Sequence, residues 1–551
     1  MKTYNIKLNA AMKTTIAKTS AAAVILAVMT IPLSAQNATE SKGTEYYKSG
    51  FNAQAKHLLL EDLRKNTGNK SDVYFYLGET YFREGKTDSA AYYYGKSLET
   101  DPSSFLAKTG QAKLKIKNDP TGAAGAFKDI LSGKNKKNAE LYVLAGRAYL
   151  DNKDYAQAEK YATDALGIDG KLSDAYILRG DIFAAEKNYG KAAEQYQQAI
   201  YFTPSKHEAY IKYSQLYSTA NYALAVEMLD RLIASDPSSA LAYRELAEVN
   251  YVNGRFSKAE QAYEKYLSLD DYYSPEEREK YASILFYNKN YEKSMEVTEE
   301  ALKNDPANFV MQRLYMYNCF ELGKYASGAE KGAAFMDNGG ADKHIYLDYV
   351  YYGRLLLKNG DSERAVAQFE KALSTGNKKA ELYRELGEIY QQAGDYDNAA
   401  KYFALFIETG GNEVRPSDYL MLGRCNYYAA SDTSQVYSEH KDEYINAADR
   451  AFAVLSEKAP DSYLGYFWRA RINSVKDPET TMGLAKPYYE KACLILEGSE
   501  GNQKQLVEAY SYLAYYYYLK EDMETSKTYW NKILVIDPEN QTAIKALRSI
   551  K

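Results

Sequence analysis

Apolar residues recur along this chain at helical spacing, and one phrase of them returns at a fixed interval. The segment YFYLGETY at 74–81 reappears as YVLAGRAY at 142–149, as YRELGEIY at 383–390 and as YSYLAYYY at 510–517. Within each phrase the large residues stand three, four and seven positions apart, which places them on one face of an α-helix. The steps between phrases are close to 34 residues or a multiple of it. The pattern therefore predicts a stack of one small helical unit, which presents a long surface instead of a single pocket.

A second apolar phrase follows the first after a short turn. AAYYYGKSLETDP at 90–102 and SKTYWNKILVIDP at 526–538 are two examples. Their spacing again makes one helical stripe, and the final proline lacks an amide hydrogen and ends the helix. A glycine recurs on the apolar face of the first phrase, where a second helix is expected to approach closely; the glycines are Gly78, Gly146, Gly180, Gly353, Gly387 and Gly423. Each unit is thus predicted to be a helix-turn-helix.

This pattern resembles the tetratricopeptide repeat (TPR) family, whose unit is a helix-turn-helix of 34 residues. The resemblance covers about residues 37–540. It implies an all-α fold, a right-handed α-solenoid of about 14 helix-turn-helix units. The expected units begin near residues 37, 71, 105, 139, 173, 207, 240, 275, 309, 346, 380, 416, 463 and 507.

The spacing of the units divides the chain into four parts. We expect a signal peptide at 1–35, a regular N-terminal array at 36–342, a less regular C-terminal array at 343–540 and a capping helix at 541–551. The C-terminal array carries an insertion of about 13 residues near 427–447. Insertions in solenoids go to loops on one face, often the binding face, so the segment 431–445 is a candidate binding loop. Neutral drift in a tolerant loop is the alternative.

The first 35 residues predict export. Four lysines without an acidic residue precede an apolar run of 13 residues, Ala21 to Leu33, and Ser34-Ala35 before Gln36 resembles a cleavage site. An N-terminal membrane anchor is the alternative, but the run is short for a membrane span. We expect an exported protein of a Gram-negative bacterium, periplasmic or associated with the outer membrane, with no membrane span after removal of the signal.

Charge and motif content argue against several classes of function. Residues 1–35 hold four of the 69 basic residues and none of the 74 acidic ones, so the formal charge of the remainder is −9. With no basic run, nucleic acid is not the expected partner. Three distant cysteines and four scattered histidines favour buried free thiols and no metal site. No phosphate-binding, nucleophile-elbow or zinc-helix motif occurs. We therefore predict no enzyme and no cofactor.

Tyrosine is the compositional anomaly, with 57 residues against 17 Phe and 2 Trp. A tyrosine can fill an aromatic core position while its hydroxyl reaches solvent or a carbonyl. Surplus tyrosines between helices would be core residues, whereas ladders of them along a groove would favour glycan binding. Most of those that can be assigned fall on core positions of the TPR unit.

The resemblance also implies which residues line the concave groove, namely positions 2, 5, 9 and 12 of each first helix. Position 5 is apolar in the early units, at Phe75, Val143, Ile177 and Ile211. Arginines take groove positions later. Arg244 and Arg384 each have a glutamate four residues on, at Glu248 and Glu388, which is the spacing of a helix-surface ion pair.

Four further groove arginines have no acid three or four residues away. Unpaired guanidinium groups beside aromatic rings suit carboxylates or phosphates. The candidate binding residues are Arg313, Tyr317, Arg354, Arg424, Tyr427 and Arg471. A solvated arginine, or one paired with a neighbouring unit, is the alternative.

Together these patterns favour an exported TPR scaffold of the periplasm or cell envelope. Its partners would be other proteins or extended peptide segments, possibly acidic, held along the concave groove and possibly within an envelope complex. The alternative from another class is a solenoid that binds glycans or surface polymers through tyrosine-rich surfaces. A hydrolase within 427–506 would need converging acids or nucleophiles, and none is evident there.

Overall fold

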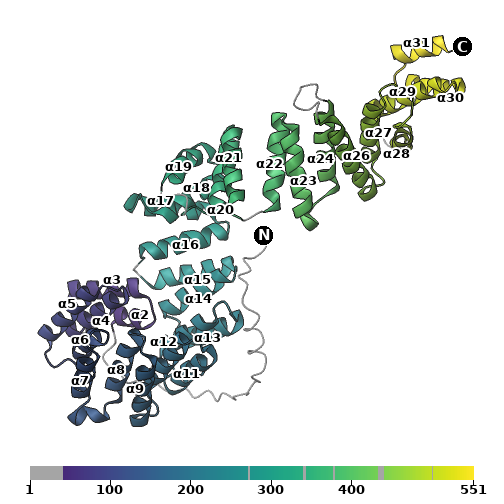
Figure 1. Ribbon diagram of the computed structural model, residues 1–551. Helices are drawn as coiled ribbons and strands as arrows, with labels where there is room; N and C mark the ends of the chain where they lie inside the picture. Colours follow the sequence, from purple (N-terminus) through teal and green to yellow (C-terminus); the bar gives the residue numbers. More distant parts are fainter. Residues whose placement is uncertain are drawn as a thin grey trace. The chain divides into compact units, whose positions relative to one another are not determined.

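The computed structural model describes residues 41–270, 273–338, 343–376, 379–431, 440–498 and 501–550. These residues form 29 α-helices and two short 3-10 helices, and they contain no strand (Figure 1). The predicted all-α repeat solenoid is confirmed. The predicted signal peptide at 1–35, and residues 432–439 of the predicted insertion, lie outside the described residues.

The chain separates into two compact units, Met1–Asn318 and Cys319–Lys551. The division falls inside α18 (Phe309–Glu321). The boundary predicted at 342 concerns the regularity of the repeat spacing, a different property, and it stays a prediction.

The N-terminal unit contains eight helical hairpins before α18. They are α2 (Lys42–Lys48) with α3 (Asn52–Lys65), α4 (Lys70–Arg83) with α5 (Thr87–Thr100), α6 (Phe105–Lys115) with α7 (Pro120–Ile130), α8 (Ala139–Asp151) with α9 (Tyr155–Ile168), α10 (Ser173–Ala185) with α11 (Tyr189–Phe202), α12 (His207–Tyr217) with α13 (Tyr222–Ser235), α14 (Ala240–Val252) with α15 (Phe256–Leu269), and α16 (Pro275–Tyr287) with α17 (Tyr291–Asn304). The 3-10 helix η2 (Gly133–Lys137) precedes α8.

The C-terminal unit begins within α18, which is followed by α19 (Tyr325–Asp337). Its further hairpins are α20 (Tyr346–Lys358) with α21 (Ser362–Ser374), α22 (Ala380–Ala393) with α23 (Tyr396–Thr409), α24 (Pro416–Ser431) with α26 (Lys441–Lys458), α27 (Tyr463–Lys476) with α28 (Lys486–Leu496), and α29 (Gln503–Leu519) with α30 (Met523–Ile536), before the last helix α31 (Gln541–Ser549). The 3-10 helix η3 (Gly411–Glu413) precedes α24. Over the described chain there are 14 helix pairs, as predicted, and 12 of their first helices begin within one residue of the expected start.

The recurring glycines bring the two helices of a hairpin together, as the sequence predicted. In four units, a Cβ on the glycine would lie between 2.4 and 3.1 Å from a ring atom of the second helix; the pairs are Gly78 with Tyr94, Gly180 with Tyr196, Gly353 with Phe369 and Gly387 with Phe403. Such a distance leaves little or no room for a side chain, so the aromatic ring packs directly on the first helix. Within each pair the two residues are 16 positions apart.

The insertion in the C-terminal unit keeps this packing. Gly423 meets the ring of Phe452 in the same way, although the two residues are 29 positions apart instead of 16. The difference is 13 residues, the predicted size of the insertion. Part of it lengthens the two helices, since α24 has 16 residues and α26 has 18. The added residues therefore do not disturb the core of this hairpin.

Much of the tyrosine surplus packs between helices. In four units a first-helix tyrosine stacks on a second-helix tyrosine 12 residues later, with ring centroids 5.2–5.9 Å apart; the pairs are Tyr81 with Tyr93, Tyr149 with Tyr161, Tyr390 with Tyr402 and Tyr517 with Tyr529. Burial raises the pKa of Tyr149 to about 12. Among the described residues, the two most exposed tyrosines, Tyr92 and Tyr201, lie on the second helices α5 and α11, whereas Tyr287, Tyr515 and Tyr518 are exposed on first helices. This distribution favours a structural use of tyrosine.

The three cysteines are buried free thiols, as expected; they are Cys319, Cys425 and Cys493. Burial raises the pKa of Cys425 to about 12, which leaves its thiol protonated and unreactive. In the part of the chain that the structure describes, no group of His, Cys, Asp and Glu side chains is placed to hold a metal ion. None of the described helices combines the length and the apolar character that crossing a membrane requires.

Candidate functional site

Charged side chains on neighbouring first helices pair with one another. Lys113 on α6 donates to Glu79 on α4 at 2.8 Å, and Arg147 on α8 donates to Asp181 on α10 at 3.1 Å. Each pair spans 34 residues, so its members hold equivalent positions in adjacent units. Residues one repeat apart thus carry opposite charges, and the charged row of the N-terminal unit is largely neutralised from within.

Pairing between first helices of adjacent units also corrects two predicted ion pairs. Arg244 was expected to pair with Glu248, four residues on, but its guanidinium contacts Glu277 on α16 at 3.0 Å. Glu248 instead accepts from Lys280 at 2.6 Å. Likewise Arg384 contacts Asp418 of the next unit at 3.1 Å, in place of the expected Glu388. The error arose because first helices of adjacent units lie side by side, so that an acid one repeat away is closer than one a helical turn away.

Two of the candidate arginines also have partners in the next unit. Arg354 donates to Glu385 through Nε at 3.1 Å and through a second contact of its Nη2. Arg471 donates to both carboxylate oxygens of Glu508, through Nε at 2.7 Å and Nη2 at 2.5 Å. These two guanidinium groups are therefore paired with a neighbouring unit, which is the alternative that the sequence left open, and they are not unpaired. Each is held in a two-pronged ion pair.

Two further candidates, Arg313 and Tyr317, lie on the part of α18 that belongs to the N-terminal unit. Tyr317 is 4% exposed and packs against the ring of Phe286 at 5.7 Å, so it is a core residue and its assignment to the groove is corrected. Arg313 lies over the ring of Phe309 at 5.1 Å.

Arg424 on α24 differs from Arg354 and Arg471. Its guanidinium lies 5.8 Å from the ring of Tyr428 and 5.5 Å from that of Trp468, and among the described residues no carboxylate reaches it. Its Nε is buried and has no hydrogen-bond partner there. Its Nη2 donates a long hydrogen bond of 3.5 Å to the hydroxyl of Tyr428. Among the described residues, Arg424 is thus held by two aromatic rings and one long hydrogen bond, without a carboxylate.

In the unit that follows Arg424, the position of Glu385 holds a different residue. Arg354 follows Gly353 and donates to Glu385. In the next unit, Glu385 stands two residues before the small residue Gly387. Arg424 follows Gly423, and the residue two before the small Ala470 of the next unit is Trp468. The position that supplies the acid to Arg354 therefore supplies an indole ring to Arg424. A ring face attracts a cation but leaves its hydrogen-bond donors unused.

Trp468 is the centre of a cluster of aromatic and cationic side chains. Arg471 lies 4.7 Å from its ring, and the rings of Tyr427 and Phe452 lie at 5.2 and 5.7 Å. Arg424, Tyr427, Tyr428, Trp468 and Arg471 are called the Arg424 cluster below. The structure thus brings three of the predicted residues together in the C-terminal unit: Arg424, Tyr427 and Arg471.

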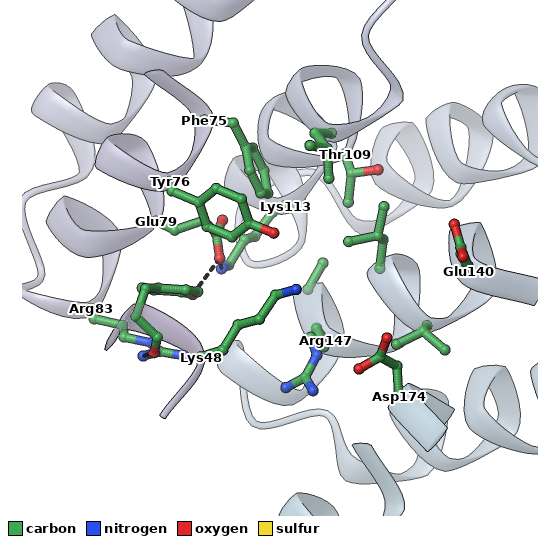
Figure 2. Close-up of a pocket in the computed structure, with 15 residues that line it drawn as sticks. Lys48, Phe75, Tyr76, Glu79, Arg83, Thr109, Lys113, Glu140, Arg147 and Asp174 are labelled. Carbon is green, nitrogen blue, oxygen red and sulfur yellow. Dashed lines mark hydrogen bonds and ion pairs between the residues drawn. The ribbon is translucent and has the colours of Figure 1, made fainter. Parts of the chain in front are cut away.

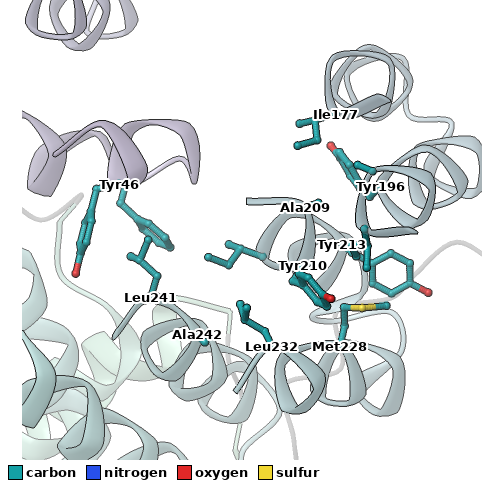
Figure 3. Packing of buried hydrophobic residues seen from close by; sticks show 14 of the residues in the cluster. Tyr46, Ile177, Tyr196, Ala209, Tyr210, Tyr213, Met228, Leu232, Leu241 and Ala242 are labelled. Carbon is teal, nitrogen blue, oxygen red and sulfur yellow. The ribbon is translucent and has the colours of Figure 1, made fainter. Parts of the chain in front are cut away.

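In the N-terminal unit the expected groove is already filled. The apolar residues at position 5 are buried, with Ile177 and Ile211 at 0% exposed. Tyr46 and Tyr47 of α2, with Phe51 just beyond it, pack into the same cluster as these two isoleucines (Figure 3). Leu241 of α14 belongs to the same cluster as Tyr46. The open surface predicted for these units is therefore covered by the chain's own first helix.

Polar contacts fix α2 to helices that follow it by more than 150 residues. Lys42 donates to Asp270 at 2.6 Å, and the hydroxyl of Tyr46 donates to the same carboxylate. Glu45 contacts His207 at 3.0 Å, and this hydrogen bond raises the pKa of the imidazole. From α3, Gln54 donates to Glu277 of α16 at 2.7 Å.

The array of the N-terminal unit consequently turns back onto its own first hairpin. Figure 1 shows α2 and α3 next to α14, the seventh first helix, and the guanidinium of Arg244 on α14 lies 4.4 Å from the ring of Phe51. The sequence predicts that the first unit begins near residue 37, five residues before α2 begins, and no repeat spacing indicates its contact with α14. Adjacent tyrosines also occur in other units, so Tyr46 and Tyr47 do not mark this contact in the sequence.

A cavity of about 260 Å³ remains beside α2. Lys48 extends into it, and Lys113, Arg147 and Asp174 lie around the space (Figure 2). Thr109 also lines it, and the buried hydroxyl of this residue has no hydrogen-bond partner among the described residues. The space within the N-terminal unit is thus larger than α2 alone fills.

Comparison with known proteins identifies the class to which this fold belongs. The sequence profile of the Tetratricopeptide repeat family matches residues 41–105, 117–173, 144–207, 215–274 and 353–413, which together are just over half of the chain. The chain belongs to the tetratricopeptide repeat family. No curated protein is similar enough to be matched.

Three solved structures of this kind are similar to the chain. The C-terminal part of a TPR repeat-containing protein from Cytophaga hutchinsonii is 30% identical over 49% of this chain and 99% of that one, with a TM-score of 0.37. PilW, described as a widely conserved type IV pilus biogenesis factor, is 17% identical over 45% and 98%, with a TM-score of 0.30. YrrB, described as a TPR protein with an unusual peptide-binding site, is 16% identical over 34% and 95%, with a TM-score of 0.28.

Proposed function

We propose that this protein is an exported scaffold of the cell envelope that captures an acidic or carboxylate-bearing segment of a partner protein at the Arg424 cluster. The TPR fold supports a protein-interaction scaffold with protein or peptide partners. The finer assignment rests on one observation, the half-buried guanidinium of Arg424 with an Nε that has no partner among the described residues.

An incoming carboxylate would complete the arrangement that the protein already builds elsewhere. At Arg354 and Arg471 a glutamate of the next unit accepts two hydrogen bonds from the guanidinium. At Arg424 the place equivalent to Glu385 holds Trp468 and the place equivalent to Glu508 holds Leu464, so an acceptor would come from outside the described chain or from water. A charge-assisted pair with a guanidinium is stronger than a neutral hydrogen bond and favours planar, two-oxygen acceptors. The aromatic rings would pack on the apolar part of the same segment.

Replacement of Arg424 by alanine is the direct test of this site. We expect R424A to retain about one tenth of the wild-type partner binding, since a hydrogen bond to a charged group is worth about 1.4 kcal/mol or more. Helicity should not change, because the guanidinium holds no carboxylate of its own chain among the described residues. The measurement is a pull-down from envelope extracts with the mature chain, quantified by mass spectrometry, followed by titration with the recovered partner.

Two matched variants separate a binding role from a general loss of charge. R450A removes an exposed arginine of α26 and should leave binding unchanged. R354A breaks the pair with Glu385 and should lower local stability more than binding. Added salt should weaken the wild type more than R424A, because the screened interaction is absent from the variant. Equal partner recovery by R424A and wild type would move the site elsewhere, most directly to the inserted segment 431–445.

The proposed export of the protein has a separate test. We expect the exported protein to begin near Gln36, because small residues precede this position and the apolar run is of the length found in signal peptides. Mass spectrometry of the envelope fraction measures the N-terminal peptide directly. If the exported protein still carries residues 1–35, this segment is an N-terminal anchor and not a cleaved signal.

A further inference from the structure

A cavity within the N-terminal unit contains a buried polar group that has no partner among the described residues. It is the space of about 260 Å³ beside α2, and side chains of α2, α4, α6, α8 and α10 line it (Figure 2). We propose that this cavity is a binding site for one free α-amino acid with an apolar side chain. Such a ligand differs in kind and in place from the protein segment proposed for the Arg424 cluster.

The size of the cavity limits the ligand to a small molecule. Pockets for drug-sized ligands have volumes of about 300–1,000 Å³. An apolar cavity of about 150 Å³ holds one benzene molecule. A space of about 260 Å³ therefore fits one ring-sized or branched apolar group together with a few polar atoms. A dinucleotide, an oligosaccharide or a peptide of several residues is too large to enter whole.

The hydroxyl of Thr109 indicates where the ligand would bind. Thr109 on α6 is 4% exposed and lines the cavity, and its Oγ1 has no hydrogen-bond partner among the described residues. A buried hydroxyl without a partner is costly, and most buried polar side chains are paired. A ligand carboxylate in the cavity would accept a charge-assisted hydrogen bond from this hydroxyl.

Charged groups of both signs lie around the same space. Lys48 and Arg147 line the cavity together with Asp174 (Figure 2). Burial alone would raise the pKa of Asp174, but the charges of Lys206 and Lys48 outweigh burial and hold it below its ordinary value, so this carboxyl is ionised at neutral pH. An α-amino acid carries an ammonium and a carboxylate. It can therefore contact both signs of charge without adding net charge to the unit.

These groups already have partners in the protein, and they keep them when a ligand binds. Arg147 pairs with Asp181 and Glu208 through its two Nη atoms. Asp174 accepts from Lys206 at 2.7 Å through one oxygen. A guanidinium has five donors and a carboxylate has about four acceptor sites, so each can hold a further partner. The side chains of Arg147 and Asp174 are 26% and 32% exposed, which leaves both within reach of a ligand.

The rest of the lining is largely apolar. Leu106 on α6 and Val143 and Leu144 on α8 line the cavity, as does Phe75 on α4. Burial of an apolar side chain against these residues would favour binding through the hydrophobic effect. A neutral sugar of similar size has no charge and no branched apolar group, so sugars are the contrasting class of ligand.

The test is isothermal titration calorimetry of the full mature chain with L-leucine, L-phenylalanine and L-methionine. We expect at least one of these amino acids to bind and D-glucose not to bind. Three analogues of the amino acid that binds most tightly separate its contacts. Its amide lacks the carboxylate, its deaminated acid lacks the ammonium, and glycine lacks the side chain. Each analogue should bind at least tenfold more weakly, because each loses one of the three proposed contacts.

Thr109→Val tests the hydroxyl. Valine has nearly the same shape as threonine, so the cavity keeps its size. We expect the affinity for the amino acid to fall about tenfold, the usual effect of losing a hydrogen bond to a charged group. Without ligand, protection of α6 against amide exchange should stay the same or rise, because an unpaired buried hydroxyl is removed. A purely structural role of Thr109 would lower this protection instead.

Asp174→Asn tests the contact of the ammonium. D174N should bind the amino acid at least fivefold more weakly, but it should bind the deaminated acid as well as wild type or better. A general loss of structure would weaken both ligands. Asp164 is an exposed aspartate of α9 outside the lining, and D164N should leave both affinities unchanged.

Three results would overturn the proposal. If none of the three amino acids binds a chain that amide exchange shows to be folded, the cavity is only a packing space. If T109V binds the amino acid as tightly as wild type, the ligand binds elsewhere. If D-glucose binds in preference to the amino acids, the cavity belongs to sugars. R424A should bind the amino acid as wild type does, so these results are separate from those for the Arg424 cluster.

Discussion

Replacement of Lys113 by methionine is expected to destabilise the units around α6 by about 3–5 kcal/mol, the usual effect of removing one member of a buried ion pair. Lys113 is 2% exposed and donates to Glu79 and to Asp151. Methionine fills a similar volume, so the loss should come from the two carboxylates that remain. Because long repeat arrays do not unfold in one step, the measurement is amide exchange of α4, α6 and α8.

The pH dependence of this loss follows from Asp151. Burial alone would raise the pKa of this carboxyl, but the charges of Lys113 and Arg83 outweigh burial and hold it below its ordinary value. A lowered folded-state pKa contributes stability above the unfolded value near 4. Without Lys113 this contribution shrinks, so the difference between K113M and wild type should be largest at neutral pH and should decrease as the pH falls below 4.

A control on the same helix distinguishes this effect from loss of any lysine. Lys115 on α6 is exposed, and K115M should change local stability by no more than about 0.5 kcal/mol. Adding Glu79→Gln to K113M should restore part of the loss, because one buried charge is removed with its partner. Equal exchange in K113M and K115M would mean that the ion pair contributes little.

Replacement of Ala399 by glutamate is expected to destabilise the C-terminal unit by several kcal/mol, through a charge buried without a partner. Ala399 on α23 is 0% exposed and packs with Phe403 and Cys425. In a repeat array each unit contacts mainly its neighbours, so the damage should stay local. Hydrogen exchange should show lost protection near 346–440 and little change elsewhere.

The matched variant places the same side chain on the exposed face of the same helix. K401E changes a residue two positions away that faces solvent, and it should leave exchange near the wild-type level. Uniform loss of protection along the whole chain in A399E would contradict the nearest-neighbour picture. So would an absence of any change.

The repeat itself was predictable because it depends on the spacing of residues within one unit. The helical face, the close-packing glycines and the terminal proline all lie within one unit, so a single sequence is enough to place them. Gly78 and Phe403 met their partners where the pattern indicated. The size of the insertion was also predictable, since the Gly423–Phe452 spacing exceeds the others by the number of added residues.

Contacts between units were harder to predict. Whether Arg354 is free depends on Glu385, which is 31 residues away and becomes a neighbour only when the helices are stacked. Arg424 shows the opposite case. The position that holds Glu385 beside Arg354 holds Trp468 in the unit that follows Arg424. The position of α2 is a longer-range property still: Lys42 meets Asp270 across 228 residues, once seven hairpins have turned the array back on itself. No periodic signal encodes that closure.

The scarcity of tryptophan gives the protein a spectroscopic property. Both tryptophans lie in the C-terminal unit, Trp468 between the two arginines of the cluster and Trp530 buried in α30. Indole emission excited at wavelengths that tyrosine does not absorb therefore arises from this unit alone. Because emission responds to nearby charge, a ligand that neutralises Arg424 would shift the Trp468 signal without a label. The remaining aromatic emission, from tyrosine, reports on the stacked hairpins in both units.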